Sequence, residues 1–148
     1  MENERASRRR PQWAGTAGLG IIAAAEILLF WGVPWVKTYF TPLVWTGYIL
    51  FIDSLAARTA GSSLIFGRTR EFLLLLPLSV VLWLIFEFYN VYLDNWHYVG
   101  LPEELFPWRL LGYYWAFATI WPAILLTAEA LRHWGPISRS RIPPIRVT

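Results

Sequence analysis

The apolar stretch at residues 72–93 reads FLLLLPLSVVLWLIFEFYNVYL and contains a single charged side chain, Glu87. A helix needs about 20 predominantly apolar residues to cross the hydrocarbon core of a bilayer, so this stretch is long enough to span a membrane. Three further stretches have the same character, at residues 13–36, 40–57 and 108–131. The sequence therefore predicts an all-α membrane protein, a bundle of four transmembrane helices.

The composition agrees with a chain that exposes apolar surface to lipid. Hydrophobic residues make up 56% of the 148 residues and aromatic residues 18%, more than a soluble domain carries. The net charge of +3 does not indicate a nucleic-acid groove, because the basic residues lie at the chain ends and in one connecting segment. The absence of cysteine excludes disulfides, thiolate nucleophiles and cysteine-ligated metal centres.

The distribution of arginine predicts the orientation. Eleven arginines fall on one side of a four-span path: Arg5, Arg8, Arg9, Arg10, Arg58, Arg68, Arg70, Arg132, Arg139, Arg141 and Arg146. The other side carries only Lys37 and Arg109 as basic residues. Because basic residues stay in the cytoplasm, we expect basic cytoplasmic tails at residues 1–12 and 135–148 around a transmembrane domain at 13–134.

Each predicted span contains one carboxylate. The four acids are Glu26, Asp53, Glu87 and Glu129. An ionised acid at the centre of a bilayer costs roughly 2.5–3.5 kcal/mol on the insertion scale, so such residues usually face the bundle interior and mark a site. With a rise of about 1.5 Å per residue, Glu26 is expected near the middle of the membrane and Glu87 in its outer half.

Asp53 and Glu129 are expected within one or two turns of the cytoplasmic surface. Arg58 and Arg132 are close to them in sequence, which predicts interfacial ion pairs, although Asp53 is also a candidate ligand-binding residue. Glu26 and Glu87 have no such neighbour. They are expected to form a site, or a buried pair that fixes helix packing.

A polar stripe runs along the third span. Ser79, Trp83, Glu87, Asn90 and Asp94 recur at spacings of 4, 4, 3 and 4, which places them on one helix face. Leucine and valine fill the other faces, so this face is expected to meet partner helices or a cavity. We expect Asn90 to hydrogen-bond Glu87, and the Glu87 carboxyl group, removed from water, to be neutral as a general acid requires.

The loop at residues 95–106, NWHYVGLPEELF, combines aromatic rings with His97, Glu103 and Glu104. One histidine and two adjacent glutamates do not make a metal ligand set. The only other histidine, His133, belongs to the opposite membrane face, which argues against haem. No metal and no cofactor are expected.

About 20 residues, from Glu87 through Asn95-Trp96-His97-Tyr98 to Pro102-Glu103-Glu104-Leu105-Phe106, resemble the membrane-embedded carotenoid (lycopene) cyclase domain family. The resemblance implies that Glu87 donates a proton, with Glu103, Glu104 or Glu26 assisting. It also implies a partner chain, since half-size domains of that family work as pairs.

These residues could supply what the cyclisation of a polyene end group requires. It needs a proton delivered to a C=C bond, and a dry, aromatic-walled cavity for the resulting carbocation. The expected ligand-binding residues are Asn90, Trp83, Trp96, Tyr98 and Asp53. No redox cofactor is required.

The sequence segments at residues 45–53, 86–90 and 95–98 also resemble an uncharacterised family of small bacterial membrane proteins. This second resemblance implies the inner (cell) membrane of a bacterium.

Three functions remain open from the sequence. The first is binding or transformation of a hydrophobic, isoprenoid-like molecule within the membrane lipid. The second is a structural or assembly subunit in a homo- or hetero-oligomer, whose acids make the contacts between subunits. The small residues Thr16, Gly20 and Ala24 of the first span form a separate stripe that predicts close packing against a neighbouring helix. The third is a proton-coupled carrier that uses Glu26 and Glu87.

Overall fold

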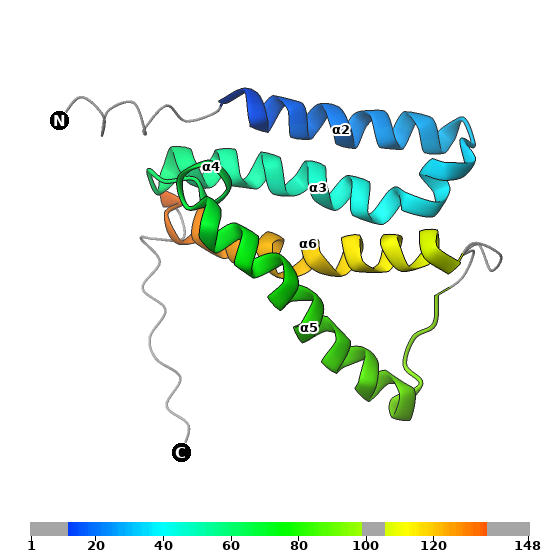
Figure 1. The fold of residues 1–148 in the computed structure, drawn as a ribbon. Helices are drawn as coiled ribbons and strands as arrows, with labels where there is room; N and C mark the ends of the chain where they lie inside the picture. Colours follow the sequence, from blue (N-terminus) through cyan, green and yellow to red (C-terminus); the bar gives the residue numbers. More distant parts are fainter. Residues whose placement is uncertain (1–11, 99–105, 136–148) are drawn as a thin grey trace, which may run out of the picture.

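The computed structural model describes residues 12–98 and 106–135, in which every regular element is a helix (Figure 1). The elements are α2 (Gln12–Phe30), α3 (Pro34–Thr59), α4 (Leu64–Gly67), α5 (Thr69–Leu93) and α6 (Phe106–Arg132). Four of them contain stretches long and apolar enough to cross a membrane: Trp13–Phe30, Pro34–Thr59, Thr69–Leu93 and Pro107–Arg132. The prediction of an all-α membrane protein with four spanning helices is confirmed.

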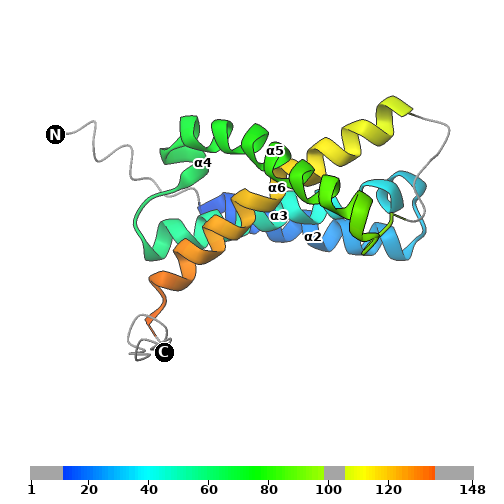
Figure 2. The ribbon, with the colours of Figure 1, turned by 90° about the horizontal axis from the view of Figure 1, so that it is seen from below.

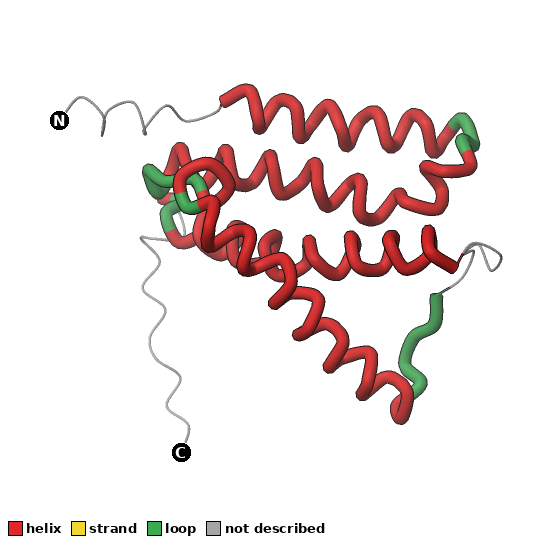
Figure 3. The backbone as a smooth tube through the Cα atoms, in the orientation of Figure 1, coloured by secondary structure: helices red, strands yellow, loops and turns green. Residues whose placement is uncertain are grey.

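The four long helices are neighbours in the order α2, α3, α6, α5. Helices α2 and α3 run side by side, α6 passes across α3 at an angle, and α5 crosses α6 and diverges from it toward its C-terminal end (Figures 1 and 2). The loop at residues 94–98 then turns back from the end of α5 (Figure 3). The first turn of α2, helix α4 and the last turn of α6 lie at one end, which we call the basic end because it holds Arg58, Arg68, Arg70 and Arg132.

Helix α2 ends at Phe30, six residues earlier than expected. Gly32 adopts a left-handed conformation with φ +76°, its N–H donates to the Leu29 carbonyl at 2.9 Å, and the Val33 N–H donates to the Leu28 carbonyl at 3.0 Å. This pair of bonds is the Schellman motif that terminates helices at glycine.

The second span begins at Pro34, six residues earlier than the expected start at residue 40. Those residues are helical up to a kink at Tyr39, where φ is −107° and ψ is 18°. Pro42 explains the kink, because its ring cannot donate to the Thr38 carbonyl and collides with it.

Two glycines allow α2 and α3 to touch through their backbones. A Cβ atom on Gly18 would clash with the Gly47 carbonyl oxygen, and one on Gly47 would lie 2.7 Å from the Gly18 carbonyl oxygen. The expected stripe of Thr16, Gly20 and Ala24 is exposed instead, and a Cβ on Gly20 would meet no atom within 4 Å. The small-residue packing expected in α2 therefore exists, but on the opposite face.

Replacing Gly18 with alanine is expected to lower the free energy of unfolding by about 1–3 kcal/mol, because the added methyl group forces two backbones apart. Thermal or denaturant unfolding in detergent micelles measures this change. Gly20→Ala is the matched control and should be neutral or slightly stabilising. Equal effects of the two substitutions would contradict the close approach.

The core lies between α3, α4 and α6, near the basic end. Its buried members are Ile49, Ile52, Ala56, Leu64, Ala123, Leu126 and Ala130. Two polar contacts fix the α3–α6 register: the Tyr48 hydroxyl lies 2.7 Å from Thr127 Oγ1, and the Trp115 Nε1–H donates to Thr46 Oγ1 at 3.0 Å.

Ser79 joins α5 to α6 at their crossing. Its buried hydroxyl donates to the Phe117 carbonyl at 2.5 Å and accepts from the Trp121 N–H at 3.1 Å. In a regular α-helix that carbonyl and that N–H pair with each other, so the hydroxyl inserts into the backbone ladder of α6 beside Pro122. The prediction that the polar stripe of α5 faces a partner helix is confirmed at this position.

Candidate functional site

One oxygen of the Glu87 carboxyl group accepts hydrogen bonds from three aromatic side chains. Its Oε1 atom accepts from Trp83 Nε1–H at 2.9 Å, from Trp96 Nε1–H at 3.4 Å and from the Tyr98 hydroxyl at 2.5 Å. Across residues 12–98 and 106–135, nothing donates to its Oε2 atom. Glu87 is half-buried and forms no ion pair with the described residues, so the carboxyl group is held in place while one oxygen stays available to a ligand.

Asn90 positions two of these donors instead of contacting Glu87. Its Oδ1 atom accepts from the N–H groups of Asn95 and Trp96 at 2.9 and 3.1 Å, and its Nδ2 atom donates to the Trp96 carbonyl at 2.7 Å. The prediction that Asn90 hydrogen-bonds Glu87 is therefore wrong. The amide fixes the backbone of the loop after Asp94, which leaves α5 in a left-handed conformation, and so brings the rings of Trp96 and Tyr98 to Glu87.

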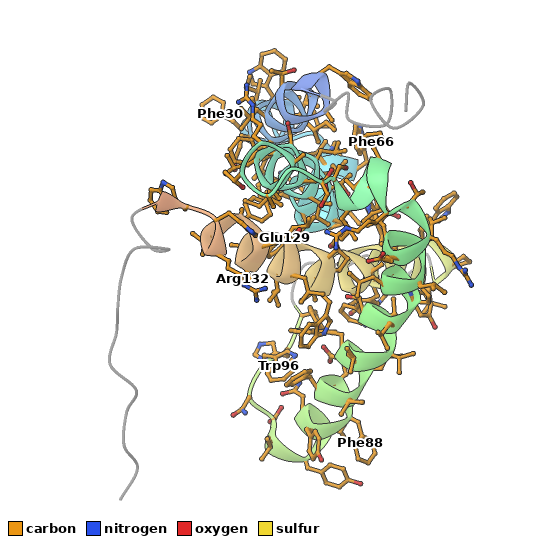
Figure 4. The ribbon with its side chains drawn as sticks, turned by 90° about the vertical axis from the view of Figure 1, so that its left-hand side faces the viewer. Phe30, Phe66, Phe88, Trp96, Glu129 and Arg132 are labelled. Atoms are coloured by element: carbon orange, nitrogen blue, oxygen red, sulfur yellow. The ribbon has the colours of Figure 1, made fainter. Side chains whose placement is uncertain are left out.

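Glu87 and Tyr98 line a cavity of about 290 Å³ between the diverging helices α5 and α6. The remaining lining residues are Leu84, Leu110, Tyr113, Tyr114 and Phe117. Leu84 and Tyr114 are also exposed on the outside of the helices, so the cavity opens toward the surface that lipid would cover. Figure 4 shows Trp96 between the loop and α5, whereas Phe88 points outward.

Aromatic rings form a continuous wall on the α6 side. Ring centroids lie 5.1 Å apart for Tyr98 and Tyr113, 5.7 Å for Tyr113 and Phe117, and 5.9 Å for Phe117 and Trp83. Arg109 lies over the Tyr113 ring, 5.6 Å from its centroid, in a cation–π contact. The sequence reasoning missed the α6 residues, although Leu110, Tyr113 and Phe117 share the i, i+3, i+7 spacing of one helix face.

The Tyr98 phenol is held in its protonated form. Burial, and then the hydrogen bond to Glu87, raise the pKa of Tyr98 from 10.0 to about 12. The hydroxyl therefore remains a hydrogen-bond donor to Glu87 throughout the physiological range.

Tyr98 predicts a stability loss at high pH. Because its pKa is higher in the folded protein, the contribution of Tyr98 to stability is complete below pH 10 and is lost as the pH rises toward 12. Comparing the ultraviolet tyrosinate titrations of the wild type and Tyr98→Phe isolates this group. The difference between the two titration curves reports Tyr98 alone, and its midpoint should lie near pH 12. A midpoint near pH 10 would contradict the contact with Glu87.

Asp53 is fully buried and its carboxylate is occupied by protein. It accepts from the Ser63 hydroxyl at 2.5 Å, from the Leu64 N–H at 2.6 Å and from the Ile65 N–H at 3.4 Å. The expected ion pair with Arg58 is wrong, because Asp53 instead binds the first turn of α4. The geometry gives this acid a structural role and offers no free oxygen for a ligand.

Glu129 forms an ion pair, but with a different arginine from the expected Arg132. The Arg68 Nη2 atom donates to both of its carboxylate oxygens, at 2.7 and 3.1 Å. Arg68 immediately precedes α5, so the pair ties the α4–α5 junction to α6.

Glu26 lies on an exposed face of α2 and contacts no charged or polar group of the described residues. Since α2 ends at Phe30, Glu26 lies about 6 Å of helix rise from that end, not near the middle of the span. The expectation that it faces the bundle interior is wrong. Because α2 packs on α3, Glu26 does not line the cavity of Glu87, and a carrier built on these two acids loses its geometric basis.

The remaining candidates, Glu103 and Glu104, lie outside the described residues. Within the described ranges, no group of three or more histidines and acids is arranged to hold a metal ion.

No protein-family model, curated protein or solved structure matches this chain. The resemblance to the carotenoid cyclase domains therefore stays a prediction. The Glu87 carboxyl group and the cavity that it lines are the basis for the function proposed below.

Proposed function

We propose that the cavity between α5 and α6 binds one end of a hydrophobic, isoprenoid-like molecule that enters from the bilayer. The observation that carries this proposal is the Glu87 carboxyl group, fixed by three ring donors at the wall of an apolar, aromatic cavity. Ligand sites combine this kind of apolar lining with a few oriented polar groups.

The size of the cavity favours an end group over a whole ligand. Its volume of about 290 Å³ is at the lower end of the range of roughly 300–1,000 Å³ for drug-sized ligands. A long polyene or prenyl chain would leave most of its length in lipid, passing out beside the exposed Leu84 and Tyr114.

Acid-catalysed cyclisation is the reaction that these groups suit best. The free Oε2 atom of Glu87 would carry a proton to a C=C bond, the cation would close the ring by attack of a second C=C bond, and a neighbouring carbon would return a proton to the carboxylate. The reaction is an isomerisation and balances without a co-reactant. The faces of Tyr98, Tyr113 and Phe117 would stabilise the cation.

Filling the cavity tests the binding step. We expect wild-type protein, purified in lipid particles from an isoprenoid-rich host, to retain an apolar molecule that solvent extraction and mass spectrometry detect above bulk lipid. Leu110→Trp should remove it, because Leu110 lines the cavity. Leu111→Trp, on the exposed neighbour, is the matched control and should retain it. Equal retention in both variants would exclude this cavity.

Expression in a lycopene-accumulating bacterium tests the reaction itself. Conversion of lycopene by the wild type and not by Glu87→Gln is the expected result. Unchanged lycopene with the wild type would remove cyclisation of this substrate and leave the binding proposal to the extraction experiment.

Assembly with another membrane chain is a second candidate, favoured by the exposed Glu26 within a spanning helix. An acid that faces lipid is costly, whereas a donor on a neighbouring helix would relieve that cost. If this role is correct, Glu26→Leu should abolish cross-linking between α2 and its partner in native membranes, while Ile27→Leu should not.

A further inference from the structure

A second cavity, of about 420 Å³, lies between α5 and α6 at the basic end. Its lining combines apolar side chains, including Leu75 and Leu125, with charged ones. The two helices reach the membrane surface here, at the start of α5 and the end of α6. This is the depth at which phospholipid head groups lie.

Two of the charged groups neutralise each other. Arg68 binds Glu129 through its Nη2 atom at 2.7 Å, and that glutamate side chain is only 23% exposed. Both members of the pair line the cavity.

Two charges on facing helices remain poorly neutralised. On α5, the only ion pair of Glu71 with a described residue is the one with Arg68, at 3.7 Å, and the Glu71 side chain is 64% exposed. On α6, Arg132 makes no hydrogen bond or ion pair with the described residues, and it lies one turn from Glu129 (Figure 4). His133 adds a ring next to Arg132, with Nδ1 2.9 Å from the Glu129 carbonyl oxygen.

The charge balance of the lining selects the ligand. The two arginines and two glutamates cancel, so with His133 neutral the formal charge of the cavity is zero. A purely anionic head group would meet both carboxylates, whereas a head group with one phosphate and one ammonium finds a partner for each charge.

We propose that this cavity binds a zwitterionic phospholipid of the phosphatidylethanolamine type. Arg132 holds the phosphate, Glu71 holds the ammonium group, and an acyl chain follows Leu75 and Leu125 along the helices. A soluble phosphoethanolamine carries the same two charges but lacks the chain. This site is at the opposite end of α5 from Glu87 and does not depend on the function proposed for the Glu87 cavity.

Native mass spectrometry of the full chain in detergent tests the proposal, with phosphatidylethanolamine, phosphatidylglycerol and O-phosphoethanolamine added separately. We expect phosphatidylethanolamine to bind most tightly. Arg132→Gln and Glu71→Gln should each weaken it about fivefold. Arg70→Gln is the matched control, because Arg70 is exposed at the same end but does not line the cavity, and it should have no effect.

Three results would overturn the proposal. Phosphatidylglycerol that binds as tightly as phosphatidylethanolamine would make the site anion-selective. Unchanged affinity in both Arg132→Gln and Glu71→Gln would place the lipid elsewhere. O-phosphoethanolamine that binds as tightly as the lipid would show that the acyl chain makes no contribution.

Discussion

Glu87→Ala is expected to lower the affinity of the α5–α6 cavity for its apolar ligand about tenfold or more, and the free energy of unfolding by about 2–3 kcal/mol. The two effects have one origin. Trp83, Trp96 and Tyr98 all donate to the same carboxylate oxygen, so truncation removes their common acceptor and releases the walls of the site.

Glu87→Gln separates structure from chemistry. The glutamine carbonyl oxygen can accept the same ring donors, so we expect most of the stability to remain while the acid is lost. Unfolding followed by tryptophan fluorescence in detergent measures stability, lycopene conversion measures the loss of the acid, and ligand retention measures the affinity of the cavity in both variants. Asp94→Asn, at an exposed left-handed position that asparagine tolerates, is the control for changing an acid nearby. If Glu87→Ala changes neither quantity, the carboxylate does not organise the site.

Asp53→Ala is expected to give the largest loss of stability in the chain, about 2–4 kcal/mol. It leaves the Ser63 hydroxyl and the N–H groups of Leu64 and Ile65 without their acceptor in a buried position. The loss should be measurable as a lower unfolding midpoint in detergent micelles.

Ser63→Ala provides the graded comparison for Asp53. It removes one donor to Asp53 and the N-cap acceptor of the Phe66 N–H, so a cost of about 1 kcal/mol is expected. Asp53→Asn should fall between the two. A stability equal to wild type for Asp53→Ala would mean that α4 does not depend on this carboxylate.

The sequence predicted the four spans because a bilayer imposes a minimum length of apolar helix, which can be read without knowing any contact. It also predicted that Ser79, Trp83 and Glu87 share a face that meets other parts of the protein, because helical periodicity fixes which side chains lie together. The divergence of α5 from α6, which creates the cavity, has no such local signal and depends on packing at Ser79.

The errors concern partners that are distant in sequence. Proximity along the chain predicts Arg58 and Arg132 as the ion-pair partners of Asp53 and Glu129, but the fold brings Arg68, 61 residues away, to Glu129. Asn90 was assigned to Glu87 because they share a helix face. The loop turns back at Asp94 and offers backbone groups that satisfy the amide more fully than one carboxylate would.

Photo-cross-linking with an isoprenoid alcohol probe tests whether the cavity beside Glu87 binds such a molecule, because it maps the site before the natural ligand is known. We expect mass spectrometry to find the probe on Leu84, Leu110 and Tyr114 of the wild-type protein, and excess unlabelled isoprenoid or Leu110→Trp to suppress this labelling. Labelling spread evenly over the lipid-facing residues of all four spans, unchanged by competitor, would contradict it.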